Sequence, residues 1–303
     1  MKQPRPSSDS LAGVQQKDFY MKQYSPSDDR GPILVLLGAV AFSLGGLLIK
    51  LIDLDPFSIN ALRCVFSSMV IGAYLYFSKH KLVINKTVVI GAFFVMLMMM
   101  TYVISNKLTS AANAIVLEYT APILVIILET IFFKKKPDKL SIFICLIVLA
   151  GIAIVVSGGV NQGSFLGDMI ALLSGLFYAL TMMLNDFENS DSLSSVFLGH
   201  LFTAFLTVFC IKNIISINTR TFLLVAALGI FQAGLGYTLL ALGLKRCEPL
   251  TGSLVACIEP VLNPILVAIF YGEYMSLRQI IGCVIVIGSI IVYNIYTSRK
   301  QKS

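Results

Sequence analysis

Ten apolar segments dominate this chain of 303 residues, and each is long enough for a helix to cross a bilayer, which takes about 20 residues. They lie at approximately 32–50, 57–78, 87–106, 111–133, 139–157, 165–185, 194–211, 221–244, 249–271 and 277–296. Hydrophobic residues make up 57% of the chain and charged residues 13%, whereas soluble domains carry about 25% charged residues. The pattern predicts an all-α integral membrane protein with ten transmembrane helices.

Lysine and arginine are distributed unevenly between these segments. Seventeen lie in the two tails and in the connections that follow every second segment, five lie in the other connections, and Arg63 lies inside a segment. Cytoplasmic connections carry the excess of positive charge, so we expect both termini in the cytoplasm, at a bacterial cytoplasmic membrane. The same distribution explains the net charge of +7 without a nucleic-acid partner.

The second half of the chain repeats the first. A shift of 138 residues superimposes Gly91 on Gly229, Lys107 on Lys245, and Pro122 on Pro260. Each repeat holds five spans, an odd number, so the two copies enter the membrane from opposite sides. Inverted repeats of this kind are typical of secondary transporters, whose substrate site lies near the bilayer midplane between the repeats.

The repeat divides the chain into four parts. We expect a disordered cytosolic tail at 1–31, a first five-helix repeat at 32–157, a second at 165–296, and a basic cytosolic tail at 297–303.

Ten spans in two five-helix halves, with a proline-bearing fourth helix in each half, resemble the drug/metabolite transporter superfamily and its EamA-type domains. Tyr271-Gly272-Glu273, followed by Gln279, Gly282 and Gly288, is similar to the family's usual ending of the ninth helix and the glycines of the tenth. The first half departs from the family, because Lys135-Lys136-Pro137 stands where a Gly-Glu pair is common. The resemblance implies export or exchange of small metabolites and leaves the substrate open.

Two spans combine a carboxyl group with proline. Glu118 and Pro122 lie in the fourth span, and Glu259, Pro260 and Pro264 lie in the ninth. A carboxylate at this depth costs roughly 2.5–3.5 kcal/mol and therefore faces the bundle interior or a wet cavity. The prolines predict helix breaks beside that cavity. The alternative for each acid is a structural hydrogen bond to a neighbouring helix.

Further polar residues inside the spans are candidates for substrate binding or coupling. Asn263 shares the polar stripe of Glu259, Arg63 could contact a substrate carboxylate or pair with Glu118, and His200 could relay protons. The remaining candidates are Tyr102, Asn106, Tyr119, Tyr178, Gln232 and Tyr237. Aromatic rings with a few polar groups suit an organic ligand, although each residue could instead serve packing. Glu129 and Asp168 lie near span ends and are expected to be solvated.

The sequence therefore predicts a secondary transporter that moves a small organic metabolite by alternating access around a cavity lined by spans 1, 3, 4, 6, 8 and 9. An amino acid or amino-acid-like compound, exported, is the favoured substrate, with protons as an optional coupling ion. The alternative is an integral-membrane enzyme or a non-transporting membrane partner protein. No nucleotide-binding loop or hydrolase motif is present, so we expect no enzyme activity, cofactor or metal. Whether the chain forms a homodimer stays open.

Overall fold

The structure is a computed structural model, which describes residues 30–109, 111–156, 164–209, 217–262, 265–266 and 276–302. Most of the N-terminal tail, together with Asn263 and Pro264, lies outside the described residues. The described residues form helices and connections without any strand. The all-α prediction is therefore confirmed.

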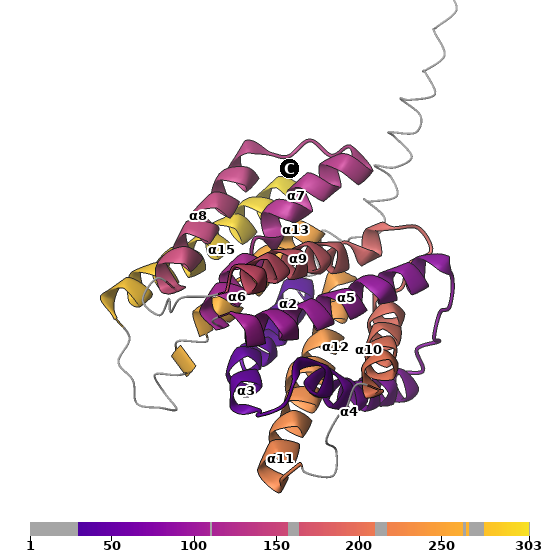
Figure 1. Ribbon diagram of the computed structural model, residues 1–303. Helices are drawn as coiled ribbons and strands as arrows, with labels where there is room; N and C mark the ends of the chain where they lie inside the picture. The colour runs from indigo at the N-terminus through magenta and orange to yellow at the C-terminus, as the bar shows by residue number, and fades with distance from the viewer. Residues whose placement is uncertain are drawn as a thin grey trace, which may run out of the picture.

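The two halves each contribute a series of helices, some of them interrupted (Figure 1). The first half contributes α2 (Arg30–Phe42), α3 (Gly45–Leu51), α4 (Pro56–Phe77), α5 (Lys86–Leu108), α6 (Ala111–Glu118), α7 (Ala121–Phe133) and α8 (Lys139–Val156). The second contributes α9 (Phe165–Met182), the 3-10 helix η1 (Leu184–Asp186), α10 (Ser192–Val208), α11 (Thr219–Ala227), the π-helix η3 (Leu228–Leu235), α12 (Gly236–Leu244), α13 (Pro249–Ala256) and α15 (Leu277–Lys302). α15 extends through the segment expected as a basic tail.

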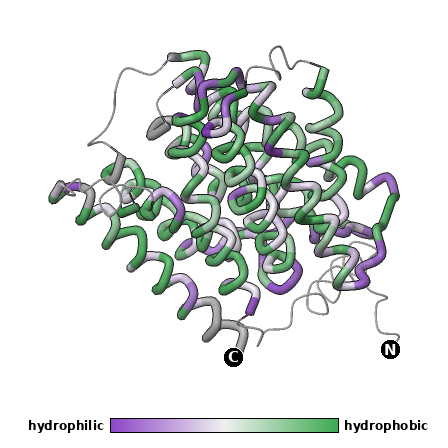
Figure 2. The backbone as a smooth tube through the Cα atoms, turned by 90° about the horizontal axis from the view of Figure 1, so that it is seen from below, coloured by the Kyte–Doolittle hydropathy of each residue, from purple (hydrophilic) through white to green (hydrophobic). Residues whose placement is uncertain are grey.

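The surface of the bundle is apolar, as a membrane requires. Among the described residues, the segments long and apolar enough to cross a bilayer are Arg30–Leu51, Pro56–Phe77, Lys86–Leu108, Phe165–Met182 and Thr219–Leu244. Five shorter apolar helices complete the set of ten expected spans. Large apolar side chains point outward, with Phe205 70% and Phe231 54% exposed, and hydrophobic residues run along most of the helices (Figure 2). Such a surface is stable in lipid and unfavourable in water.

The helices of the two repeats pack in a pseudo-two-fold pattern. α2 packs against α12 and α5 packs against α9, so the first span of each repeat contacts the third span of the other. α4 packs against α10, which joins the two second spans, and α8 packs against α15, which joins the two fifth spans. The repeats therefore share one interdigitated bundle (Figure 1).

Side chains at the loop ends fix where several helices begin. Asp55 accepts hydrogen bonds from the backbone N–H groups of Phe57 and Ser58, at 3.0 and 3.1 Å. Asn85 and Asp191 cap α5 and α10 in the same way. These side chains satisfy backbone N–H groups that have no partner inside the helix.

Interruptions near the middle of four spans bring backbone irregularity to the centre of the bundle. The first span breaks at Ser43–Leu44, the fourth at Tyr119–Thr120, the ninth at Cys257–Ile258, and the eighth contains η3. The breaks in the fourth and ninth spans lie 138 residues apart, which is the shift of the repeat. The proline pattern predicted these two, whereas the break in the first span and the π-helix were not expected.

Candidate functional site

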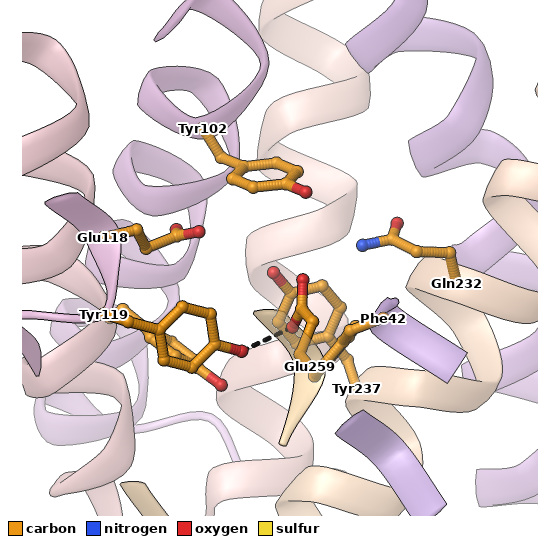
Figure 3. Close-up of a pocket in the computed structure, with 8 residues that line it drawn as sticks. Phe42, Tyr102, Glu118, Tyr119, Gln232, Tyr237 and Glu259 are labelled. Atoms are coloured by element: carbon orange, nitrogen blue, oxygen red, sulfur yellow. Dashed lines mark hydrogen bonds between the residues drawn. The ribbon is translucent and has the colours of Figure 1, made fainter. Parts of the chain in front are cut away.

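The interrupted spans converge on a cavity in the centre of the bundle (Figure 3). Its lining residues are Phe42, Tyr102, Glu118, Tyr119, Tyr178, Gln232, Tyr237 and Glu259. They come from spans 1, 3, 4, 6, 8 and 9, the six from which the sequence predicts a lining. The space between them is about 280 Å³, counting its open side. This volume includes space that is open to solvent, so the residue types of the lining, and not its size, describe the site.

The two equivalent helix breaks place the two carboxyl groups, one directly before its break and the other directly after. Glu118 is the last residue of α6, directly before its break, and Glu259 is the first residue after the break that follows α13. The acids are therefore not repeat equivalents, although the breaks are. Pro122 and Pro260 each follow a break and are buried. Each proline lies beside an irregularity of its span, and neither is among the lining residues.

Each cavity carboxyl group is hydrogen-bonded to a hydroxyl group on another span. The Ser174 hydroxyl donates to Glu118 Oε1 at 2.7 Å, and the Tyr119 hydroxyl donates to Glu259 Oε2 at 2.5 Å. Glu118 is 7% and Glu259 6% exposed. Within the described residues, neither acid has a lysine or arginine nitrogen within 4.0 Å. Both can therefore accept a guest cation without displacing a protein cation.

Aromatic rings form the rest of the wall. Tyr119 and Tyr178 pack edge to face with ring centroids 6.1 Å apart, and Phe42 and Tyr237 lie 4.7 Å apart. The hydroxyl groups of Tyr102 and Tyr178 have no hydrogen-bond partner among the described residues, although each residue is only 5% exposed. Buried polar groups of folded proteins are almost always paired, so these two are available to a ligand.

Arg63 lies behind the wall of the cavity. Its side chain is fully buried and donates to Asn60 Oδ1 at 3.1 Å, to the Met99 carbonyl at 3.2 Å and to Gln232 Oε1 at 3.5 Å. The guanidinium carbon lies 6.0 Å from the centre of the Tyr102 ring. The structure thus places Arg63 neither in contact with the cavity nor in an ion pair with Glu118.

Two other predicted site residues also lie outside the cavity lining. His200 is fully buried, with Nδ1 2.8 Å from the Val196 carbonyl and its ring against Tyr237 at 5.2 Å. The Asn106 amide donates to the Tyr102 carbonyl at 3.0 Å. Both hydrogen bonds run to a carbonyl one turn back on the same helix, and His200 Nε2 and Asn106 Oδ1 have no hydrogen-bond partner among the described residues. Asn263 and Pro264 lie outside the described residues.

Sequence analysis missed two residues of the site. Phe42 lies one residue before an unpredicted helix break, and no proline announces that break. Ser174 lies one helical turn before Tyr178 on α9, so it shares a face with a predicted residue. The four-residue spacing from Tyr178 could have identified Ser174. Phe42 could be identified only once the position of the break in the first span was known.

Two acids near the helix ends, Glu129 and Asp191, are paired with basic residues. Glu129, which was expected to be solvated, is 8% exposed and accepts from Lys135 at 2.6 Å, because the chain after α7 turns back over it. Asp191 Oδ2 lies 2.9 Å from Lys245 Nζ and 3.0 Å from His80 Nε2. Although burial acts in the opposite direction, the Ser194 N–H and the Lys245 ammonium lower the pKa of Asp191 below its usual value. Asp168 accepts from the Thr109 hydroxyl at 2.7 Å.

Comparison with known proteins places this architecture among transporters. The model of the EamA-like transporter family matches residues 29–157 and 165–295. The uncharacterized transporter YxxF of Bacillus subtilis (strain 168) is 24% identical over 270 residues, which cover 84% of this chain and 86% of that protein. Solute carrier family 35 member G1 of Homo sapiens is 24% identical over 184 residues, covering 54% of this chain and 49% of that protein. A solved crystal structure with 19% identity superimposes with a TM-score of 0.75, over 90% of this chain and 99% of that chain.

Proposed function

Because the chain belongs to the EamA-like transporter family, we propose that it is a secondary carrier that moves a compact organic metabolite by alternating access. The observation that carries the proposal is the central cavity, whose two carboxyl groups come from equivalent helix breaks in opposite repeats. A site at the junction of two repeats can open to either side when the helices around it change position.

An amino acid or a similar metabolite is the substrate that this lining favours. Glu118 and Glu259 provide acceptors for an ammonium group, and four tyrosines surround them. Aromatic faces attract cations and pack against apolar side chains. The ammonium group of a compact zwitterion would bind the carboxyl groups, and its organic side chain would pack against the aromatic rings. We propose export as the direction of transport.

Glu259 is the group through which we propose proton coupling. It begins the helix that follows the break, and its partner is a phenol from the opposite repeat. A change in the relative position of the helices that carry Tyr119 and Glu259 would alter this hydrogen bond. Proton exchange at Glu259 would thereby be tied to the switch between the inward-facing and outward-facing states.

The movement must involve units that mix both repeats. α2 packs against α12 and α5 against α9, so the sequence halves cannot separate as two blocks without breaking these contacts. We propose that the irregular backbone at the four interruptions absorbs the change, because irregular segments bend with less loss of hydrogen bonds than regular helices.

Transport by the purified chain in proteoliposomes tests the proposal. Vesicles with an imposed pH gradient would be supplied with each of the twenty radiolabelled L-amino acids, and empty vesicles would serve as the blank. We expect accumulation of at least one amino acid, retained by Gly288→Ala, since a methyl group there meets no atom within 4 Å. The double variant Glu118→Gln/Glu259→Gln should abolish it. Equal uptake by wild-type and empty vesicles for all twenty would refute an amino-acid carrier.

A further inference from the structure

The side-chain amide of Gln232 has a fixed orientation. Arginine has only donors, so the atom of Gln232 that faces Arg63 at 3.5 Å is the acceptor Oε1. The amide nitrogen is consequently turned towards the cavity, as Figure 3 shows. Such assignments follow from the hydrogen-bond network, and here the network leaves one choice. Gln232 therefore presents its amide nitrogen to the cavity as a hydrogen-bond donor, while its amide oxygen accepts from the positively charged Arg63.

Close packing of η3 on α4 produces this contact. A Cβ atom on Gly229 would lie 2.7 Å from the Arg63 carbonyl oxygen and 2.6 Å from Phe66 Cβ. Only glycine permits the two helices to approach this closely. The π-helix then turns Gln232 from this contact towards the cavity.

A second unused polar group lies beside the same point. A Cβ atom built on Gly45 would lie 3.1 Å from Gln232 Nε2 and 3.0 Å from the Tyr102 hydroxyl oxygen. The Tyr102 hydroxyl has no partner among the described residues. The two groups therefore lie within about 6 Å of one another beside Gly45, close enough for the two oxygens of one carboxylate to accept from both.

The charge of Arg63 has no counter-charge in direct contact. The guanidinium group is permanently charged, fully buried, and hydrogen-bonded in the described structure only to neutral groups. A buried charge is costly without an opposite charge nearby. An anionic group bound at Gln232 would supply that charge, and the Gln232 amide would join it to Arg63.

We propose that Gln232 and Tyr102 form a subsite for the substrate's carboxylate, with Arg63 as the positioning residue and the ammonium group held by Glu118 and Glu259. This inference rests on the proposed carrier function and deepens it. Gln232 and Glu118 lie on opposite sides of the cavity in Figure 3. A free amino acid thereby brings a group of opposite charge to each end of the cavity, whereas an amine brings one. The cavity is specific for zwitterions.

Three matched probe pairs test this specificity on the purified full-length protein. Each pair is an amino acid and its decarboxylated amine: L-leucine with isoamylamine, L-phenylalanine with phenethylamine, and L-serine with ethanolamine. Intrinsic tyrosine fluorescence reports binding, since the chain has no tryptophan and four tyrosines line the cavity. A hydrogen bond to a charged group contributes about 1.5–3 kcal/mol, so wild type should bind an amino acid at least about 10-fold more tightly than its amine.

Two variants separate recognition from packing. Gln232→Glu keeps the size of the side chain and an acceptor for Arg63 but replaces the inward donor by an oxygen. This variant should weaken binding of the amino acid at least about 10-fold, and its affinity for the amine should be unchanged or higher. Gly45→Ala places a methyl group between the Tyr102 hydroxyl and the Gln232 amide nitrogen. It should weaken binding of the amino acid and leave binding of the amine unchanged. Gly288→Ala, with open space around the added methyl group, should alter neither.

The outcomes distinguish this inference from the carrier function itself. Equal loss of both members of a pair in Gln232→Glu would show a packing role and overturn the subsite. A wild-type protein that binds amines as tightly as amino acids would overturn zwitterion specificity while leaving a carrier intact. A wild-type protein that binds none of the three amino acids would overturn the inference. The proteoliposome assay decides the carrier function independently.

Discussion

The two acids of the cavity and two acids near the helix ends, Asp191 and Glu129, have different kinds of partner. Glu118 and Glu259 are bonded to hydroxyl groups of serine and tyrosine, whereas Asp191 and Glu129 are bonded to lysines. The helix-end acids are part of fixed ion pairs: Lys245–Asp191 joins two segments 54 residues apart, and Lys135–Glu129 closes the turn that ends α7. The cavity acids keep their capacity to meet a mobile cation, such as a proton or a substrate ammonium group.

The difference shows how one bundle separates stability from function. In both ion pairs the acid side chain is only 10–12% exposed, whereas the lysine side chain is 30–31% exposed, so the positive end of each pair stays open to solvent. A fixed cation beside Glu118 or Glu259 would occupy the position that a substrate needs. Hydroxyl partners hold the carboxyl groups in place without neutralising them. This contrast predicts that substitutions in the two regions affect different measurements.

Replacing Glu259 should have the largest effect on transport. Glu259→Gln keeps the size of the side chain and its bond with Tyr119 but cannot exchange a proton. We expect proton-driven accumulation to fall more than about 10-fold, the equivalent of 1.4 kcal/mol, and the pH dependence of transport to flatten. Exchange of labelled for unlabelled substrate should persist. Unchanged accumulation at every pH would make Glu259 a structural hydrogen-bonding group and remove it from the coupling mechanism.

Glu118→Gln should have a smaller effect in the same assay. Its partner is Ser174 on α9, and the variant can keep this bond through the amide oxygen. We expect substrate binding to weaken about 3-fold to 10-fold through loss of an ammonium partner, with pH-dependent accumulation retained. If Glu118→Gln instead abolished accumulation while Glu259→Gln did not, the coupling role would belong to the first repeat.

Tyr119→Phe should act more weakly still, because it removes a neutral donor and leaves the ring. Loss of one neutral hydrogen bond costs about 0.5–1.5 kcal/mol, so we expect a change of about 2-fold to 10-fold in the affinity for substrate. Ser174→Ala provides the matched removal of a hydroxyl group at Glu118. Identical effects of the two variants on pH dependence would argue against different roles for the two acids.

Asp191→Asn should leave transport unchanged and reduce stability. Asparagine caps helices as well as aspartate, so the variant isolates the charge, and we expect a loss of about 1 kcal/mol at pH 7. Because the folded protein lowers the pKa of Asp191, its charge stabilises the fold above the unfolded value of about 3.9. That contribution disappears as the pH falls through the lower, folded value.

Thermal denaturation of wild type and variant at several pH values measures this effect. The melting temperatures should differ at pH 7 and converge towards pH 3. Altered selectivity in Asp191→Asn, with an unchanged melting temperature, would break the contrast between the two regions.

The sequence was sufficient for the features that follow from one helix at a time. Span lengths, the shift of 138 residues and the breaks at Pro122 and Pro260 all depend on local pattern. The convergence of Glu118, Glu259 and the tyrosines on one cavity could be expected too, since polar groups at mid-span must face inward.

Features that depend on contact between helices were not predictable in the same way. Arg63 could equally have faced the cavity, and only the glycine contact of η3 with α4 places it behind Gln232. Glu129 appeared solvated because the left-handed conformation of Lys134, which turns Lys135 back over Glu129 at the end of α7, has no glycine to announce it. The break after Phe42 has no proline, and the Ser43 hydroxyl, bonded to the Val40 carbonyl at 2.6 Å, provides only a weak local signal.

The interdigitation of the repeats has a consequence for biosynthesis. α2 (Arg30–Phe42) packs against α12 (Gly236–Leu244), so roughly 200 residues separate synthesis of the two partners. At about 5–20 residues per second, the first span waits roughly 10–40 s in the bilayer before its partner leaves the ribosome. During that interval its inward face meets lipid or another partner. The bundle can therefore close only late in translation, and any chain that stops before the eighth span leaves the first one without its native neighbour.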